Sequence, residues 1–403
     1  MSPSPDREGT RVWPWHDAEV PAAEHKGTDV EERVSPLELF FDLVFVFAIT
    51  QVTALIAADP TWNGLLRGLL VLAVIWWAWA AYAWLTNTLD TDESRTRVVM
   101  FLAMAAMFVV ALSIPNAFGE HALLFACAYL VVRAAHIVLY GYAANDVGVR
   151  VAGRRLAPST LLAAGLLLAA AALDGVAQVG LWTLAVAIDY AGPVMVGMVG
   201  WTLHAGHFAE RHGLIIIIAF GESIVAAGVG AEAAGLDAGV LAAGVLAIAI
   251  AAALWWAYFD VVALVAERHL REASGARRLA MARDSYSYIH LLMIAGIVLV
   301  AVGVKTTIAK VDQPLPTVPA VALVGGVALY LLGHIAFRLR NVRTLNKQRL
   351  VMAVGCLGLI PVAPSLDALA ILAIIAAFCT SLILYEAIRF REARARVRAA
   401  ARP

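Results

Sequence analysis

The sequence places ionisable side chains within or beside long apolar runs, where a charge is costly. Inside a bilayer such groups usually face the protein interior and mark ion, proton or substrate sites. Carboxylates, arginines and one histidine of this kind are the primary candidates for a proton-binding or substrate-binding site: Asp42, Arg133, His136, Asp189, Glu210, Arg211 and Glu222. The secondary candidates are Glu38, His207, Asp284, His290 and His334.

Glu222 ends the apolar part of the stretch HFAERHGLIIIIAFGES (207–223). It stands 12 residues after Glu210, which is about 18 Å along a helix that rises 1.5 Å per residue. Gly221 and Ser223 on either side of it permit close approach of another helix. Glu222 is therefore either a protonatable carboxyl group that lines a cavity or a carboxyl group that ties two helices together by a hydrogen bond.

Two carboxylates stand at the start of the first apolar segment. Ser35-Pro36-Leu37-Glu38 is typical of a capping box, with Ser35 as the N-cap residue and Glu38 bonding back to it. Asp42 follows one turn later on the same helix face, and a cap does not need it. The pair could bind a cation, share a proton or form an ion pair. Arg133, Arg211 and a neighbouring histidine are possible partners.

Arg133 lies in the middle of an apolar segment and needs a carboxylate partner, for which Glu222, Asp189 and Asp42 are candidates. His136, three residues further on, could titrate near neutral pH or be a core histidine with satisfied hydrogen bonds. Asp189 precedes Pro193, which should kink or break its helix. Broken helices near the bilayer midplane often mark binding sites.

His207, Glu210 and Arg211 belong to a polar cluster at the start of the seventh apolar segment. The spacing HxxHxxE from His204 could supply metal ligands, but it lies on one helix without a ligand from elsewhere, so we predict no metal site. The simpler interpretation is that Glu210 and Arg211 form a charge pair at the membrane interface. The sequence also predicts no cofactor and no nucleic-acid partner.

The elements that carry these residues are indicated by composition. The chain of 403 residues is 62% hydrophobic and 15% charged, whereas soluble domains are about 45–50% apolar and about 25% charged. The apolar residues gather in segments close to the length that spans a bilayer. The sequence therefore predicts an all-α, polytopic integral membrane protein with about twelve spans, at roughly 37–57, 65–86, 97–115, 121–143, 158–173, 177–199, 209–230, 237–262, 283–304, 317–337, 350–363 and 367–388.

Basic residues predict how these spans are oriented. If both termini are cytoplasmic, 26 of the 30 Lys and Arg residues fall on the cytoplasmic side, as the positive-inside rule requires. We therefore expect a multi-pass protein of the cell inner (plasma) membrane. The N-terminal tail 1–34 should be cytoplasmic and disordered, 35–390 should form the transmembrane domain, and 391–403 should be a basic cytoplasmic tail.

The transmembrane domain could consist of two parallel six-helix repeats, 35–200 and 201–390. Trp76-Trp77 recurs as Trp255-Trp256, and the first and seventh segments both begin with a carboxylate in their first turn. Repeats of even helix number in the same orientation would be related by an axis along the membrane normal.

The stretches SPLELFFDLVFVFAIT (35–50) and HFAERHGLIIIIAFGES (207–223) together resemble the bacterial low temperature requirement protein A family. The resemblance in order and hydropathy covers about 35–390. It implies a multi-pass membrane protein of a family named for a growth phenotype, and it implies no particular substrate or reaction.

These observations favour a proton-coupled transporter or permease of unknown substrate, with a buried cavity that holds Asp42, Arg133, His136, Glu222 and Asp189. Its partners would be the lipid bilayer and a small-molecule or lipid substrate. One alternative is a membrane-embedded enzyme that acts on a lipid or isoprenoid. Another is a non-catalytic membrane protein of stress adaptation, in which the buried charges only determine packing.

Overall fold

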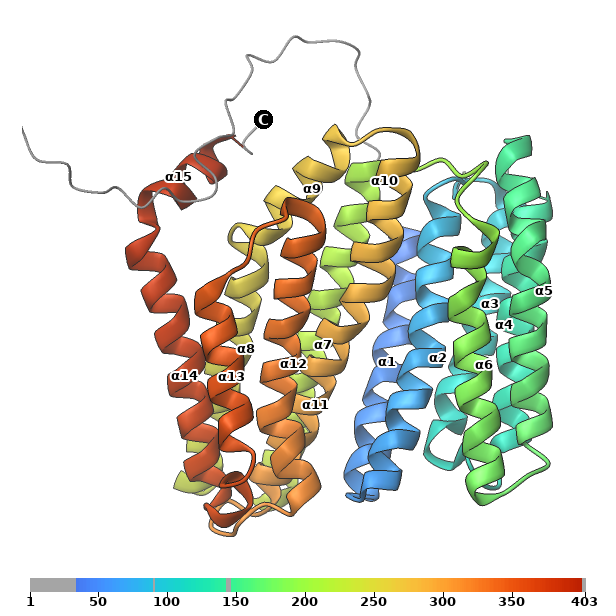
Figure 1. The fold of residues 1–403 in the computed structure, drawn as a ribbon. Coiled ribbons are helices and arrows are strands. Elements are labelled where there is room, and N and C mark those ends of the chain that lie inside the picture. The colour runs from blue at the N-terminus through green and yellow to red at the C-terminus, as the bar shows by residue number, and fades with distance from the viewer. Residues whose placement is uncertain (1–33, 90, 143–145, 401–403) are drawn as a thin grey trace, which may run out of the picture.

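The computed structural model describes residues 34–89, 91–142 and 146–400, and these form a bundle of long helices (Figure 1). Each of the twelve predicted segments is helical, and the described residues contain no β-strand, which confirms the all-α class. The α-helices are α1 Pro36–Ala58, α2 Trp62–Thr86, α3 Ser94–Ser113, α4 Ala122–Tyr142, α5 Val147–Ala170, α6 Gly175–Val196, α7 Ala205–Ala234, α8 Ala238–Phe259, α9 Val262–Glu272, α10 Gly275–Met281, α11 His290–Ala309, α12 Thr317–Val342, α13 Lys347–Leu359, α14 Ala368–Arg389 and α15 Arg391–Ala400.

Ten of these helical stretches are long and apolar enough to cross a membrane, within the described ranges. The fifth and eleventh predicted spans, α5 and α13, are not among them. The start of α5 carries Arg150, Arg154 and Arg155, and α13 has only 13 residues. The structure thus confirms a polytopic helical membrane protein, and the count of twelve spans stays a prediction.

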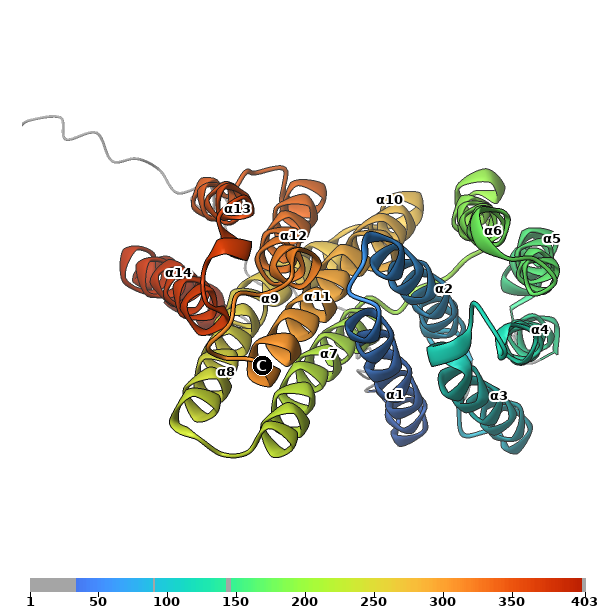
Figure 2. The ribbon, with the colours of Figure 1, turned by 90° about the horizontal axis from the view of Figure 1, so that it is seen from below.

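The helices form two groups, α1–α6 and α7–α14, which lie side by side when the bundle is viewed along its axis (Figure 2). In the first group α1 contacts α2 and α3, α3 contacts α4, α4 contacts α5, and α2 contacts α6. In the second group α7 contacts α8 and α11, α11 contacts α12, α12 contacts α13, and α8 contacts α14. This is the correspondence that a duplication would produce. The predicted division into two repeats stays a prediction.

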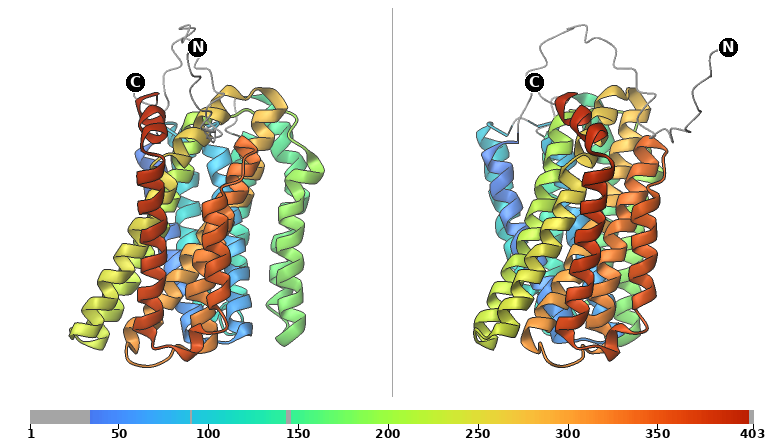
Figure 3. Two further views of the ribbon diagram at one scale, coloured as in Figure 1. Left: turned by 60° about the vertical axis from the view of Figure 1, so that its left-hand side comes forward. Right: turned by 90° about the vertical axis from the view of Figure 1, so that its left-hand side faces the viewer.

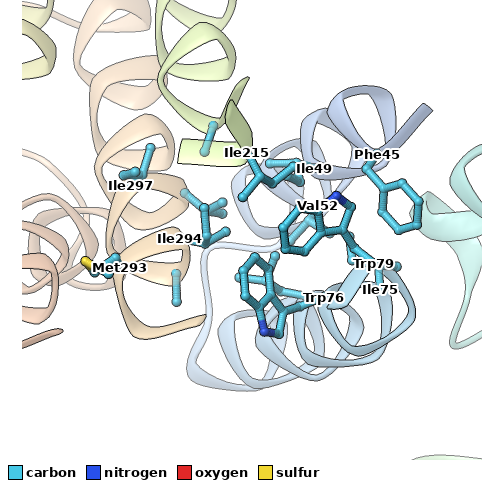
Figure 4. Packing of buried hydrophobic residues seen from close by; sticks show 14 of the residues in the cluster. Phe45, Ile49, Val52, Ile75, Trp76, Trp79, Ile215, Met293, Ile294 and Ile297 are labelled. Carbon is cyan, nitrogen blue, oxygen red and sulfur yellow. The ribbon is translucent and has the colours of Figure 1, made fainter. Parts of the chain in front are cut away.

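The boundary between the two groups is a seam formed chiefly by α1, α2, α7 and α11. Its middle is apolar: Ile49 and Val52 of α1 and Trp76 of α2 approach Ile215 of α7 and Ile294 of α11 (Figure 4). Between these apolar side chains the two groups meet through van der Waals packing, as helices in a bilayer generally do.

The first and last described residues, 34 and 400, lie at the same end of the helix bundle. The start of α1, the short helices α9 and α10, and the basic helix α15 are all found there (Figures 1 and 3). Arg394 and Arg398 of α15 form ion pairs with Asp260, which follows α8. The charged stretch 263–282 is largely helical, and the predicted tail 1–34 lies almost entirely outside the described residues.

A π-helical segment, η2 (Ala282–Ile289), joins α10 to α11. Long π-helical segments are rare and often occur at functional sites. Two tryptophans of α2 donate hydrogen bonds to it, from Trp76 Nε1 to the Ser287 carbonyl at 2.7 Å and from Trp84 Nε1 to the Ser287 hydroxyl at 2.8 Å. The hydroxyl of Tyr288 donates to the carbonyl of Tyr190 in α6 at 2.5 Å. This segment of the second group is therefore bonded to two helices of the first.

The pair α11–α12 approaches closely through glycines. A Cβ atom built on Gly326 would lie 2.8 Å from the carbonyl oxygen of Gly296 and 2.9 Å from the nitrogen of Val300. The adjacent Gly325 faces away, and a Cβ atom there would meet nothing closer than Val321 at 3.9 Å. Small residues that let backbones touch are a common means of helix association in membranes.

We predict that Gly326→Ala destabilises the protein, because the added methyl group would push α11 and α12 apart. Overpacking of this kind costs about 1–3 kcal/mol. Thermal unfolding of the detergent-solubilised protein measures the effect, and Gly325→Ala is the matched control on the same helix. Equal melting temperatures for the two variants would contradict the close packing described here.

Candidate functional site

Arg211 of α7 lies at the centre of a buried ion cluster, together with two carboxylates of α1. Its Nη1 atom is 2.6 Å from Glu38 Oε1, and its Nη2 atom is 2.6 Å from Asp42 Oδ1. Nη1 also donates to the Thr86 hydroxyl at the end of α2 at 3.0 Å. The three charged side chains are at most 1% exposed, so the cluster joins α1, α2 and α7 away from water.

The cluster continues through His207 and Asn87. His207 Nε2 is 3.0 Å from Glu38 Oε2, and its Nδ1 is 3.0 Å from Asn87 Nδ2. The Asn87 side chain also accepts a hydrogen bond from the backbone N–H of His204 at 2.8 Å. The end of α2 is therefore bonded to the residues that begin α7, at the level of the ion cluster.

Glu38 also completes the predicted capping box. Its carboxylate accepts from the backbone N–H of Ser35 at 2.9 Å, and the Ser35 hydroxyl accepts from the N–H of Glu38 at 3.3 Å. One carboxylate thus caps α1 and binds Arg211. The preferred interpretation of Asp42, a buried ion pair, agrees with its contact to Arg211 and with a hydrogen bond from Trp79 Nε1 at 2.9 Å.

The predicted interfacial pair between Glu210 and Arg211 is not the arrangement found. Glu210 is exposed, whereas Arg211 is fully buried and turned toward α1. Helix geometry explains the difference: His207 and Arg211 are four residues apart and share a face, while neighbouring residues point in different directions. Proximity in the sequence therefore indicated the wrong partner.

Arg133 of α4 forms a second buried ion pair, with Asp189 of α6. Its Nη2 atom is 2.9 Å from Asp189 Oδ1 and 3.2 Å from the hydroxyl of Thr160 in α5. Both charged residues are at most 5% exposed. Of the three partners considered for Arg133, the structure places Asp189 beside it. The pair ties α4, α5 and α6 together within the first group.

His136 lies near this pair, and its Nε2 atom is 3.2 Å from the carbonyl oxygen of Ala81 in α2. The predicted break at Pro193 does not occur, because α6 continues through Pro193 to Val196. The chain then runs without regular structure until α7 begins at Ala205, with left-handed backbone at Gly197 and Gly200.

Glu222 lies deep in α7 and is 2% exposed. Its Oε2 atom accepts a very short hydrogen bond from the hydroxyl of Thr50 in α1. The hydrogen-bond partners of Arg133 are Thr160 and Asp189, and Glu222 is not among them. The alternative in which Glu222 bonds to a neighbouring helix agrees with this geometry.

The single cavity expected to hold Asp42, Arg133, His136, Asp189 and Glu222 is therefore not formed. Asp42 belongs to the Arg211 cluster, Glu222 contacts Thr50, and the other three lie between α2, α4 and α6. These residues have different partners: Arg133 of α4 pairs with Asp189, and Asp42 of α1 pairs with Arg211. Glu222 of α7 bonds to Thr50.

The remaining candidates lie in the second group. Asp284 pairs with Arg283 at 2.8 Å and with Arg340 at 3.0 Å in a partly exposed position. His290 Nε2 is 2.9 Å from the hydroxyl of Tyr258. His334 Nδ1 is 2.9 Å from Arg349 Nη1. The described residues hold no group of three or more His, Cys, Asp or Glu side chains that could bind a metal ion.

Several buried ionisable residues are not among the predicted site residues, and they include Arg349, Glu386 and His212. Arg349 of α13 binds Glu386 of α14 at 2.9 Å, and both are buried. His212 is fully buried among rings, including Trp79 at 4.9 Å and His290 at 5.2 Å between centroids. Arg349 directly precedes the predicted segment 350–363, and Glu386 lies near the end of the segment 367–388, so neither stood out as a charge in the middle of an apolar run. His212 was overshadowed by the charged residues beside it.

Comparisons with known proteins agree on the kind of protein. A sequence model of the family described as bacterial low temperature requirement A protein (LtrA) matches residues 33–384. The chain is also similar to the uncharacterized protein RA0937 of Rhizobium meliloti (strain 1021), with 27% identity over 319 residues that cover 76% of this chain and 77% of that protein. No solved structure matches the chain.

We predict that Arg211→Met strongly destabilises the protein, because two buried carboxylates would lose their cation. Breaking a buried ion pair from one side costs about 3–5 kcal/mol. Adding Asp42→Asn to Arg211→Met should restore part of the loss by removing one uncompensated charge. Thermal unfolding in detergent measures both effects.

The matched control for this prediction is Glu210→Gln, which removes an exposed charge next to Arg211 and should change the melting temperature little. If Arg211→Met and Glu210→Gln were equally mild, the ion cluster would not stabilise the seam between the two groups.

Proposed function

The chain belongs to the bacterial low temperature requirement A family, and we propose that it is a proton-coupled transporter of a small solute in the inner membrane. In this proposal Glu222 carries the proton, and the two helix groups move relative to each other along the seam between α1 and α7.

The observation that carries the proposal is the partner of Glu222. Among the described residues five carboxylates are buried, namely Glu38, Asp42, Asp189, Glu222 and Glu386. Four of them form ion pairs with an arginine. Glu222 instead contacts a hydroxyl group, and its charge is not neutralised by an adjacent cation. A carboxylate at such a depth is costly unless it takes up a proton.

The hydrogen bonds of Thr50 support the same conclusion. The Thr50 hydroxyl lies within hydrogen-bonding distance of both Glu222 Oε2 and the carbonyl oxygen of Val46, the latter at 3.1 Å. A hydroxyl group has one hydrogen to donate. If Glu222 carries a proton, it can donate to the Thr50 oxygen while the Thr50 hydroxyl donates to Val46, so that each contact has its own hydrogen. The arrangement therefore suits the protonated form.

Loss of this proton would change the seam. An ionised Glu222 needs water or a cation, and Lys305 of α11 acts on it electrostatically without forming an ion pair. Opening of α1 away from α7 at this level would admit water, while the Arg211 cluster holds the other end of the same helix pair. Polar contacts at two levels of one helix pair are suited to alternating access, in which one group rocks against the other.

The proposed orientation places both termini in the cytoplasm. It rests on the 26 of 30 basic residues that then fall on the inner side, and on the charged helices α9, α10 and α15, which share one end of the bundle (Figure 3). The Arg211 cluster would then close the cytoplasmic end of the seam.

We predict that Glu222 is protonated at neutral pH. Infrared difference spectra should show the carbonyl stretch of a buried carboxylic acid in the natural protein, and this band should be lost in Glu222→Gln. Glu232→Gln, an exposed position on the same helix, is the matched control and should keep the band.

In proteoliposomes that enclose a pH-sensitive dye, a transported solute added outside should acidify the lumen. Glu222→Gln should reduce that signal to the level of empty liposomes, and Glu232→Gln should leave it unchanged. Full solute-driven proton uptake by Glu222→Gln would refute the role of Glu222. Turnover of a labelled lipid without any dependence on a proton gradient would instead favour a membrane-embedded enzyme.

The orientation is tested by single cysteines in a background that lacks the exposed Cys127. A membrane-impermeant maleimide should label Asp312→Cys, in the connection between α11 and α12, in intact cells. It should label Glu392→Cys, in α15, only after the membrane is permeabilised. The reverse pattern would place both termini outside.

A further inference from the structure

A pocket lies within the first helix group, between α2, α4, α5, α6 and the η2 segment. Trp77 and Trp84 of α2 form one side, and Trp201, in the irregular segment 197–204, forms another. One stripe of α4 gives the wall three of its polar residues: Arg133, His136 and Tyr140. Other elements add Ser159, Thr160, Asp189, Arg283 and Ser287. The three residues of α4 are spaced three and four residues apart, so they share one helix face.

All three of these side chains carry atoms without a hydrogen-bond partner in the described part of the chain. They are the Nε and Nη1 atoms of Arg133, the Nδ1 atom of His136 and the hydroxyl group of Tyr140. Each residue is at most 3% exposed. A buried polar atom without a partner is costly, and native proteins contain few of them. Three on one stripe of one pocket indicate a ligand that satisfies them.

The unsatisfied atoms define the chemistry of that ligand. Arg133 offers N–H donors, which require an acceptor such as a carbonyl oxygen. His136 Nε2 faces the carbonyl of Ala81, so the ring must carry its hydrogen on Nε2 to make that bond, and Nδ1 is left as an acceptor. The hydroxyl of Tyr140 can do either. The ligand therefore needs both a carbonyl-type acceptor and an N–H or O–H donor, close enough to span about one helical turn.

The charge of the pocket favours an uncharged ligand. The positive charge of Arg133 is balanced by Asp189 at 2.9 Å. Arg283 at the rim is partly exposed and pairs with Asp284. A fully ionised ligand would add an uncompensated charge to a buried neutral site, which is unfavourable. The indole walls of Trp77, Trp84 and Trp201 provide flat apolar surfaces instead.

We propose that this pocket binds a small, uncharged, planar heterocycle that carries a carbonyl group and an N–H group on the same edge, as a nucleobase does. Arg133 binds the carbonyl oxygen, His136 accepts from the N–H group, and the tryptophans cover the ring. As the substrate class of the transporter, this assignment rests on the proposed function. As a binding site, it is tested without any transport.

The pocket is small in this structure. Its cavity volume is about 50 Å³, whereas a cavity of about 150 Å³ holds benzene. A ligand therefore requires a wall to move. Segment 197–204 is suited to this, because it is irregular and meets the start of α5 through Gly200 and Gly148.

The same segment leads directly into His204, which is bonded to Asn87, and then into α7. Movement of the pocket wall would thus act on the start of α7, where Arg211 binds Glu38 and Asp42. Ligand entry is connected in this way with the contact that closes one end of the seam.

The experiment uses the full chain in detergent, with uracil, hypoxanthine and nicotinamide as uncharged probes and benzoate and inorganic phosphate as anionic probes. Binding is followed by tryptophan fluorescence and by the shift in melting temperature. We expect at least one uncharged heterocycle to bind, and Tyr140→Phe to weaken its binding about 3- to 10-fold, which corresponds to one buried hydrogen bond.

Tyr140→Phe removes only an oxygen atom that has no partner among the described residues, so it should leave the fold intact. Tyr330→Phe is the matched control, because it removes a hydroxyl that bonds to Leu254 in the second group. It should leave binding unchanged. If no heterocycle binds, if binding is equal in Tyr140→Phe, or if only the anions bind, the proposal is overturned.

Glu222→Gln separates this inference from the proposed function, because it should keep heterocycle binding in detergent while losing proton uptake in liposomes. Binding without any proton uptake by the natural protein would refute proton coupling and leave the binding site standing. Solute-driven proton uptake without binding at Tyr140 would do the opposite.

Discussion

The contact on which the arrangement of this protein depends is that of Arg211 with Glu38 and Asp42. A bilayer offers no water to a buried charge, so the protein must supply a partner. In each buried ion pair of the described residues that partner comes from another helix: α1 with α7, α4 with α6, and α13 with α14. The need to neutralise charge therefore determines which helices must stay together.

Two of the ion pairs lie within a single helix group, and one ion cluster lies between the two groups. Arg133 with Asp189 and Arg349 with Glu386 each lie within one helix group, and they make the outer helices of that group a unit. The Arg211 cluster lies across the seam, whose middle is apolar packing between Ile49, Val52 and Ile215 (Figure 4). Apolar surfaces can slide or separate without losing hydrogen bonds, whereas an ion cluster has a defined geometry. Hydrogen bonds also cross between the two groups, from Trp76 and Trp84 to Ser287 and between Thr50 and Glu222. Relative motion of the groups would therefore have to exchange these contacts as well as those of the ion cluster.

Sequence patterns predicted what depends on local structure. All twelve segments are helical, and the capping box of Ser35 and Glu38 is present, because both follow from periodicity and from contacts within a few residues. Partner choice could not be predicted in the same way. Arg211 has Glu210 beside it in the sequence, but the helix turns them apart, and its partners lie 169 and 173 residues away. Glu386 lies near the end of its predicted segment, 367–388, where the sequence does not indicate how deeply a charge is buried.

The charge of the pocket and the protonation of Glu222 together determine what would drive the proposed transporter. The pocket at Arg133 and Asp189 is neutral and suits an uncharged ligand, while Glu222 takes up a proton without a neighbouring counter-charge. Each cycle would then move one positive charge together with a neutral solute. A charge that crosses the membrane gains about 2.3 kcal/mol per 100 mV of potential, so uptake would draw on the membrane potential as well as on the pH difference. An arginine beside Glu222 would remove that advantage, because the carboxylate would stay ionised and no proton would be carried. In the proposed cycle, a buried carboxylate without an ion pair is therefore what allows a proton to be carried, so that the membrane potential can drive uptake.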